Sequence, residues 1–142
     1  MFGRIFRRAA SSSVQVGRSG ASSSAGVAAS AIRTRVSTNI TGVEVHPSPL
    51  SALKKTYQST LNLIAALPEE SVYRNATVAV TKHRLAVVND VMSSEAKQGR
   101  SADSEEAIAA FEQQIDQGLA EEVLDQAKHE LKLAGKMVDW KP

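Results

Sequence analysis

From Leu50 onward, large apolar residues recur at steps of three and four positions along the chain. This spacing places their side chains on one face of an α-helix. No stretch alternates between apolar and polar residues over the length of a strand, as a half-buried sheet requires. The chain after Gly42 is therefore predicted to be all-α. The first apolar series consists of Leu50, Leu53, Tyr57, Leu61, Ile64 and Leu67.

Capping residues and helix breakers set the expected helix ends. Ser48 followed by Pro49 favours a helix start, and Pro68 disfavours helical backbone in the residue before it. Thr81 lies among β-branched residues, so a kink or break is expected there. The polar residues 92–103 predict an exposed loop. The expected helices form a small three-helix bundle and run over about 49–66, 71–90 and 104–140, the last capped by Asp103 or Ser104 and broken near Gly118.

The first 43 residues differ in charge from the rest of the chain. They contain six arginines, nine serines and no acidic residue, whereas the remainder holds 11 of the 17 basic residues and all 15 acidic ones. This composition is typical of a mitochondrial transit peptide, and residues 1–10 would form a short basic amphipathic helix. The alternative is a Ser-rich tail without fixed structure. We predict a disordered or extended leader over 1–37, processed between Arg35 and Val36, and a helical bundle over 38–142.

The sequence offers little material for catalysis. The chain has no cysteine, which excludes disulfides, thiolate-held zinc and Cys-ligated iron–sulfur clusters. His129 follows Asp125 at helical spacing, but two ligands do not define a metal site. The glycine-rich residues 17–26 lack the GK[ST] ending of a phosphate-binding loop. We predict no enzyme activity, no cofactor and no metal.

Two classes of partner are also unfavoured. The body carries no stripe of basic residues interleaved with aromatic ones, as an RNA-binding surface requires. No run of 18 apolar residues occurs, so no transmembrane helix is expected. The remaining possibility is a protein-binding surface. Aromatic and arginine residues commonly anchor such surfaces, and the candidates are Tyr73, Arg74, Lys132, Lys136 and Trp140, with core packing as the alternative for Tyr73.

Two segments carry a resemblance to a known family. Residues 66–88 hold a P-x(4)-YR element formed by Pro68, Tyr73 and Arg74, and a second element formed by Thr81 and Leu85. The final segment, residues 118–142, matches at Glu121, Glu122, Val123, Gln126, Ala127, Glu130, Leu131, Leu133, Ala134, Lys136, Met137 and Trp140. Over about residues 42–141 the chain resembles a small accessory subunit of mitochondrial respiratory complex I, the NADH dehydrogenase 1 alpha subcomplex subunit 5 family.

The resemblance implies a non-catalytic helical subunit on the matrix side of the inner membrane. Family members stabilise the peripheral arm, support its assembly in respiratory electron transport, and dock on a core subunit of about 30 kDa, so these roles reach the present chain by analogy. Compared with the family, the polar residues 92–103 are long, and many relatives continue beyond Pro142. Two alternatives are a matrix assembly factor or a structural subunit of another respiratory-chain complex. A more distant one is a small matrix enzyme or metal carrier that uses His129.

Overall fold

The computed structural model describes residues 33–140 of the chain. Within these residues, four α-helices follow one another: α1 (Pro49–Ile64), α2 (Val72–Lys97), α3 (Glu105–Ile115) and α4 (Ala120–Trp140). The all-α prediction is confirmed for the described residues, which hold no strand. The predicted count of three helices is not exact, because the region expected over 104–140 with a break near Gly118 forms two separate helices. The leader helix expected over residues 1–10 and the glycine-rich residues 17–26 lie outside the described residues.

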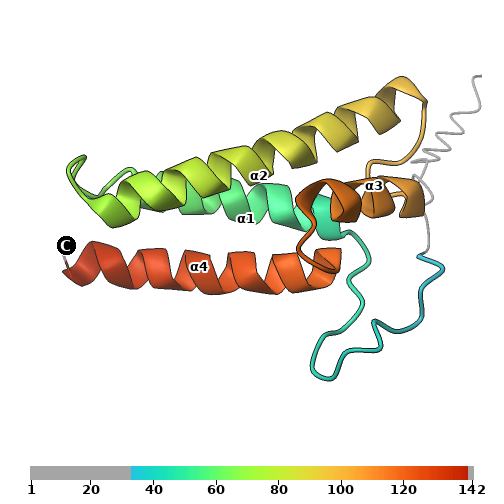
Figure 1. The fold of residues 1–142 in the computed structure, drawn as a ribbon, viewed down its shortest axis with the longest axis horizontal. Coiled ribbons are helices and arrows are strands. Elements are labelled where there is room, and N and C mark those ends of the chain that lie inside the picture. Colours follow the sequence, from blue (N-terminus) through green and yellow to red (C-terminus); the bar gives the residue numbers. More distant parts are fainter. Residues whose placement is uncertain (1–32, 141–142) are drawn as a thin grey trace, which may run out of the picture.

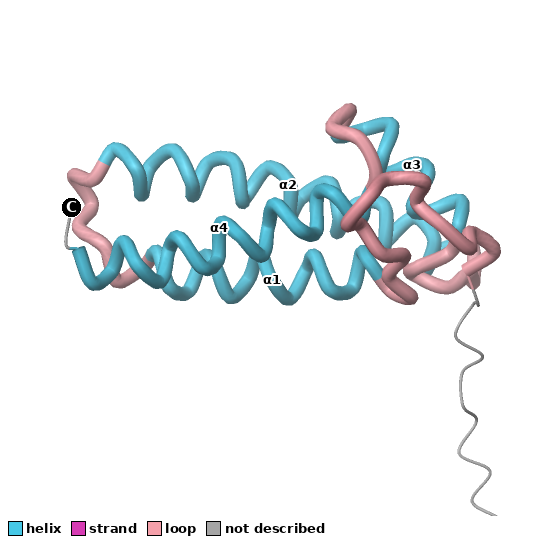
Figure 2. Tube along the Cα trace, turned by 90° about the horizontal axis from the view of Figure 1, so that it is seen from below, coloured by secondary structure: helices cyan, strands magenta, loops and turns pink. Residues whose placement is uncertain are grey.

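The three long helices share one long axis (Figure 1). Helix α1 packs against both α2 and α4, and α2 runs antiparallel to α1 and α4. The short helix α3 packs mainly against α2, at the end of the bundle where α1 begins. The view turned by 90° shows α3 and the segment before α1 gathered at that same end (Figure 2). Among residues 33–140, no helix is both long and apolar enough to cross a membrane.

Helix α1 is capped from a distant part of the chain. Ser48 occupies the N-cap position, as expected, but its side chain accepts no capping hydrogen bond. Instead, Asp103 Oδ1 accepts from the backbone N–H groups of Leu50 and Ser51, at 2.8 and 3.2 Å. A carboxylate at this place satisfies N–H groups that have no partner within the helix. Ser104, next to Asp103, caps α3 by accepting from Ala107 N at 3.1 Å.

Helix α2 is longer than predicted and continues unbroken through Thr81. The expected loop over residues 92–103 is wrong in its first half, because α2 ends only at Lys97. Tertiary packing overrides the weak helix propensity here. Thr81 and Val91 are buried, and buried Glu95 accepts a hydrogen bond from Ser104 Oγ at 3.0 Å.

The break near Gly118 separates α3 from α4. Asp116 and Gly118 both have positive φ, at 50° and 89°, a conformation that glycine adopts without steric penalty. Glu112 Oε1 accepts from the backbone N–H of Ala120 at 2.9 Å, so a side chain of α3 caps the first turn of α4. The positive φ angles and the Glu112 cap together define the short turn that joins α3 to α4.

The core consists of two clusters of buried side chains. The larger one receives residues from all four helices: Leu50, Leu53, Tyr57, Val88, Val91, Ala107, Ile108, Phe111, Ala120, Val123, Leu124 and Ala127. The smaller one, at the opposite end, is built on Ile64, Leu67 and Ala134, with Tyr73, Val78, Met137 and Val138 packed against it. Both ends of the bundle are thus held by apolar packing, which is the dominant stabilising term in a fold of this size.

Residues 33–47, which we call the N-terminal strap, cross the end of the bundle that holds α3. The strap contains a tight turn in which Thr38 Oγ1 donates to the carbonyl of Val43 at 2.6 Å. Thr38 is buried, and the side chain of Arg33 contacts residues of both α3 and α4. The expected leader of residues 1–37 therefore overlaps a segment that packs on the helices.

Candidate partner interface

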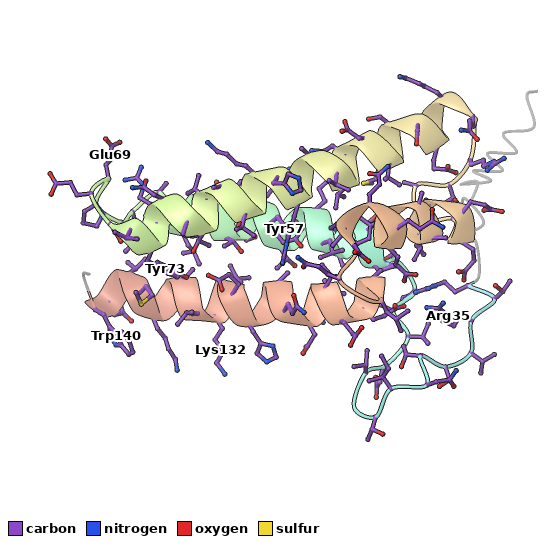
Figure 3. All side chains as sticks on the ribbon, in the orientation of Figure 1. Arg35, Tyr57, Glu69, Tyr73, Lys132 and Trp140 are labelled. Carbon is purple, nitrogen blue, oxygen red and sulfur yellow. The ribbon has the colours of Figure 1, made fainter. Side chains whose placement is uncertain are left out.

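The exposed face of α4 carries a row of cations that ends in an aromatic residue. Lys128, Lys132, Lys136 and Trp140, which we call the α4 stripe, are all exposed. Residues four apart lie about 40° from each other around a helix, so the four side chains leave α4 on one side. Figure 3 shows Lys132 and Trp140 pointing away from α2. The indole is the most exposed aromatic group of the described residues, with 72% of Trp140 accessible.

The stripe lysines hold no acidic partner within the described part of the chain. Each ion pair found between residues 33 and 140 involves an arginine or His129, and none involves Lys128, Lys132 or Lys136. An exposed tryptophan at the end of a row of lysines that have no acidic partner within residues 33–140 suits an acidic protein surface with an apolar patch.

The other two predicted interface residues serve the fold. The Tyr73 hydroxyl donates to Glu130 Oε1 of α4 at 2.6 Å, and its ring packs against the smaller core cluster. Arg74 donates to the carbonyl of Leu67 at 2.6 Å and pairs with Glu69 at 3.6 Å, so it closes the turn between α1 and α2. The structure therefore brings Lys132, Lys136 and Trp140 together on one face and places Tyr73 and Arg74 elsewhere.

A groove of about 530 Å³ runs between α2 and α4, which do not pack closely against each other. Its floor is formed by Tyr57 and Thr60 of α1, and its walls include Val80 of α2 and Leu133 of α4. Figure 3 shows Tyr57 in the space between the two helices. Most of the lining is apolar or carries a threonine hydroxyl, which suits an apolar side chain better than a charged small molecule.

Two tyrosines near this groove have raised pKa values. Burial is the main cause of the raised pKa of Tyr57, and the nearby Arg84 guanidinium partly offsets it. For Tyr73, burial, the hydrogen bond to Glu130 and the negative charge of Glu130 together raise the pKa to about 12. Both phenols stay neutral at physiological pH, and neither is poised to act as a general base.

The titratable residues of the described region do not assemble a metal site. His129 Nδ1 lies 3.3 Å from Asp125 Oδ2, but both side chains are largely exposed on one face of α4. Residues 33–140 contain no group of three or more His, Asp or Glu side chains placed to hold a metal ion. The His129 and Asp125 pair is therefore an ordinary helix-surface pair.

Two features of the structure are not among the sequence-derived candidates. Lys128 belongs to the α4 stripe, and the four-residue spacing between Lys128 and Lys132 is the sequence feature that could have identified it. Arg33 lies in the segment predicted as leader, yet its side chain is only 4% exposed. No local pattern marks it, because its partners Glu105 and Glu121 lie more than 70 residues away in the sequence.

Comparison with known proteins shows that the chain is similar to members of one family. Residues 42–122 match the family model described as ETC complex I subunit conserved region. The chain is 32% identical over 110 residues to the probable NADH dehydrogenase [ubiquinone] 1 alpha subcomplex subunit 5, mitochondrial, of Arabidopsis thaliana. It is 30% identical over 105 residues to the subunit of that name from Bos taurus, and 34% over 108 residues to the probable one from Caenorhabditis elegans.

These matches cover most of the present chain but different shares of the relatives. The aligned parts take 78%, 74% and 74% of this chain for the plant, bovine and nematode proteins. They span 57% of the plant protein and 63% of the nematode protein, and 78% of the bovine one. The family model spans α1, α2, α3 and the first residues of α4, and part of the longer relatives has no counterpart in the alignments.

Proposed function

Since the chain belongs to the NADH dehydrogenase 1 alpha subcomplex subunit 5 family, we propose that it is a non-catalytic accessory subunit of mitochondrial complex I. In this role it stabilises the matrix-facing peripheral arm on the inner membrane and supports assembly of the complex. The observation that carries the proposal is the combination of this family match with a bundle whose most distinctive exposed feature is the α4 stripe. Electron transfer and quinone reduction belong to other chains.

The proposed docking surface is the α4 stripe. Burying a tryptophan side chain at an interface contributes more to the binding free energy than burying most other side chains. Lysines near that tryptophan favour a partner with an acidic surface. A neighbouring subunit of the peripheral arm, with the core subunit of about 30 kDa as the first candidate by analogy, would cover Trp140 and pair with Lys132 and Lys136. Tyr73 and Arg74 then act indirectly, because they hold the smaller core cluster and the α1–α2 turn that support the last turns of α4.

The arginine-rich, acid-free residues that precede the strap support mitochondrial import. Their composition matches a transit peptide, which is recognised by its positive charge and amphipathic helix. Two relatives, from Arabidopsis thaliana and Neurospora crassa, are named as mitochondrial. These observations support a mitochondrial location, and we propose that the mature protein lies on the matrix side of the inner membrane.

Affinity purification from mitochondria tests this function directly. The chain carries a C-terminal tag, and the complex is released with a mild detergent so that the peripheral arm stays intact. Complex I subunits are expected in stoichiometric amounts with the tagged chain. Recovery with the subunits of a different respiratory complex, or with assembly intermediates alone, would instead support one of the two alternatives.

Depletion of the chain provides the second test. Native gels of mitochondrial membranes are expected to show less assembled complex I, while the NADH oxidation rate per remaining complex stays unchanged, because the chain supplies packing surface and no reacting group. Normal assembly with selectively altered NADH oxidation per complex would contradict a structural role. Restoring the chain from a plasmid serves as the control for side effects of depletion.

A further inference from the structure

Arg33 is the most buried charged side chain of the N-terminal strap, and it joins three parts of the fold. Its Nε donates to Glu105 Oε1 of α3 at 3.3 Å. One terminal nitrogen pairs with Glu121 of α4 and also donates to the carbonyl of His46 at 3.2 Å. Only 4% of the Arg33 side chain and 2% of the Glu121 side chain are exposed. The guanidinium therefore links the strap to the first turns of both α3 and α4.

The neighbouring residues of the strap strengthen the same attachment. The backbone N–H of Thr34 donates to Glu105 Oε1 at 3.2 Å, and Arg35 lies 3.8 Å from Glu112 of α3. Burial alone would raise the pKa of Glu105, but the hydrogen bond and charge of Arg33 outweigh it and hold that pKa below its ordinary range. The Glu105 carboxylate is thus ionised and held by residues 33–35.

Loss of Arg33 would leave a buried carboxylate without its charge partner. Glu121 Oε2 already lacks a hydrogen-bond partner within residues 33–140, so Arg33 is the main group that compensates the buried charge. Removing one partner of a buried ion pair is strongly destabilising, because the remaining charge stays away from water. Cleavage between Arg35 and Val36, which the sequence alone favours, would remove Arg33, Thr34 and Arg35 together.

We propose that Arg33 is retained in the mature protein, so that any proteolytic removal of the leader ends on its N-terminal side and residues 33–47 are a permanent part of the fold. The leader of residues 1–37 is thereby shortened to at most residues 1–32. A processing protease meets the precursor before it folds, so the helices do not shield the bond after Arg35. Cleavage there would instead affect the folded product, because a domain that begins at Val36 would fold with Glu121 buried and without its charge partner. This proposal rests on the proposed mitochondrial function only in that any removal of the leader would accompany import.

The mature N-terminus is measured on the protein isolated from mitochondria, by labelling free α-amino groups and identifying the terminal peptide. A first residue at position 33 or earlier, including an uncut chain, supports the proposal. A first residue at position 34 or later overturns it. Absence of the protein from mitochondria would count against the proposed function, whereas a mitochondrial protein that co-purifies with complex I and begins at Val36 would overturn this proposal alone.

Thermal unfolding of the full 142-residue chain tests the physical cause separately. Arg33→Ala is expected to lower Tm by on the order of 10 °C. Arg35→Ala is the matched control, since its side chain is 35% exposed and 3.8 Å from its acidic neighbour, and it should shift Tm by no more than about 3 °C. The double variant Arg33→Met with Glu121→Gln removes both charges and should recover at least about half of the loss.

Equal Tm values for Arg33→Ala and the unaltered chain would overturn the claim that the strap is held by this contact. If Arg33→Ala fails to fold, Arg33→Lys keeps the charge but not the forked geometry and should fold with an intermediate Tm. An Arg33→Lys chain as stable as the unaltered one would contradict the role of the guanidinium in joining three groups. The mitochondrial N-terminus remains decisive in either case.

Discussion

At the scale of single residues, the two tyrosines of the bundle differ in the hydrogen bonding of their hydroxyl groups. The Tyr73 hydroxyl donates to Glu130 at 2.6 Å, whereas the buried Tyr57 hydroxyl has no hydrogen-bond partner within residues 33–140. We expect Tyr73→Phe to lower the free energy of unfolding by about 1 kcal/mol, because a carboxylate loses its donor. Tyr57→Phe should change it by less than about 0.5 kcal/mol or increase it, since no bond is lost.

Urea unfolding of the two variants at pH 7 gives both values from one assay. A Tyr57→Phe chain that loses as much stability as Tyr73→Phe would show that Tyr57 has a partner that the structure does not contain. Both substitutions keep the aromatic ring, so any difference between the two variants comes from the hydroxyl group and not from ring packing.

The raised pKa of Tyr73 predicts a loss of stability at alkaline pH. Its pKa rises from 10.0 to about 12 on folding, first through burial and then through Glu130. Between these two pH values, Tyr73 keeps its proton in the folded state and loses it in the unfolded state. The contribution of Tyr73 to the free energy of unfolding is therefore constant below pH 10 and falls as the pH rises from 10 to 12. Unfolding curves at several pH values from 8 to 11.5 should show this fall, and Tyr73→Phe should make it shallower. An unchanged slope in the variant would assign the fall to other groups.

At the scale of helices, the start of α1 depends on a residue that follows α2. Asp103 accepts from two N–H groups of the first turn of α1, whereas Ser48 at the N-cap makes no such bond. Asp103→Ala is therefore expected to lower the free energy of unfolding by about 1–2 kcal/mol, as the loss of a helix cap does. Ser48→Ala, the control, should lower it by no more than about 0.5 kcal/mol.

Chemical denaturation of both variants measures the two effects, with the helix content before unfolding checked by circular dichroism. A larger loss for Ser48→Ala than for Asp103→Ala would return the capping role to the local serine. The two variants thus distinguish Ser48, the cap expected from the local sequence, from Asp103, which only the fold brings to the start of α1.

The same distinction explains how much of the fold is predictable from sequence. Apolar spacing and Pro49 predict the start of α1, and Gly118 predicts the break before α4, because these signals act through the local backbone. The extension of α2 to Lys97 is not predictable in this way, since buried Glu95 is held by Ser104 from the next helix. The role of Arg33 is not predictable from local sequence for the same reason, because its acidic partners lie far away along the chain. For the proposed interface, Lys132, Lys136 and Trp140 are predicted as candidates from residue type and position, but only the fold separates them from Tyr73 and Arg74.

At the scale of the whole molecule, the bundle divides its surface between self-stabilisation and docking. The strap, α3 and the first turns of α4 are tied together by Arg33 and by Glu112, which caps α4. The opposite end carries Trp140, exposed at the end of the α4 stripe (Figure 3). The end fixed by ion pairs is thus distinct from the face proposed to bind a neighbour, so the two can be altered independently.

This separation allows the docking surface to be tested without disturbing the fold. The double substitution Lys132→Glu with Lys136→Glu, and separately Trp140→Ala, should reduce recovery of the chain with complex I by at least about fivefold, because charge reversal against an acidic surface and loss of an aromatic anchor each weaken binding by more than about 1 kcal/mol. Both variants should melt within about 3 °C of the unaltered chain, since the altered side chains are exposed.

The matched control reverses two exposed lysines on other helices, Lys55→Glu in α1 with Lys82→Glu in α2. It changes the net charge by the same amount, so a non-specific effect of charge on import or solubility would appear in both double variants. Each variant replaces the unaltered chain in mitochondria, and native gels and affinity purification measure its incorporation. If the control loses incorporation as strongly as the stripe variant, the effect of charge reversal is non-specific, and Trp140→Ala alone tests the stripe. If both stripe variants assemble normally, the docking face lies elsewhere, and the groove between α2 and α4 becomes the surface to alter next.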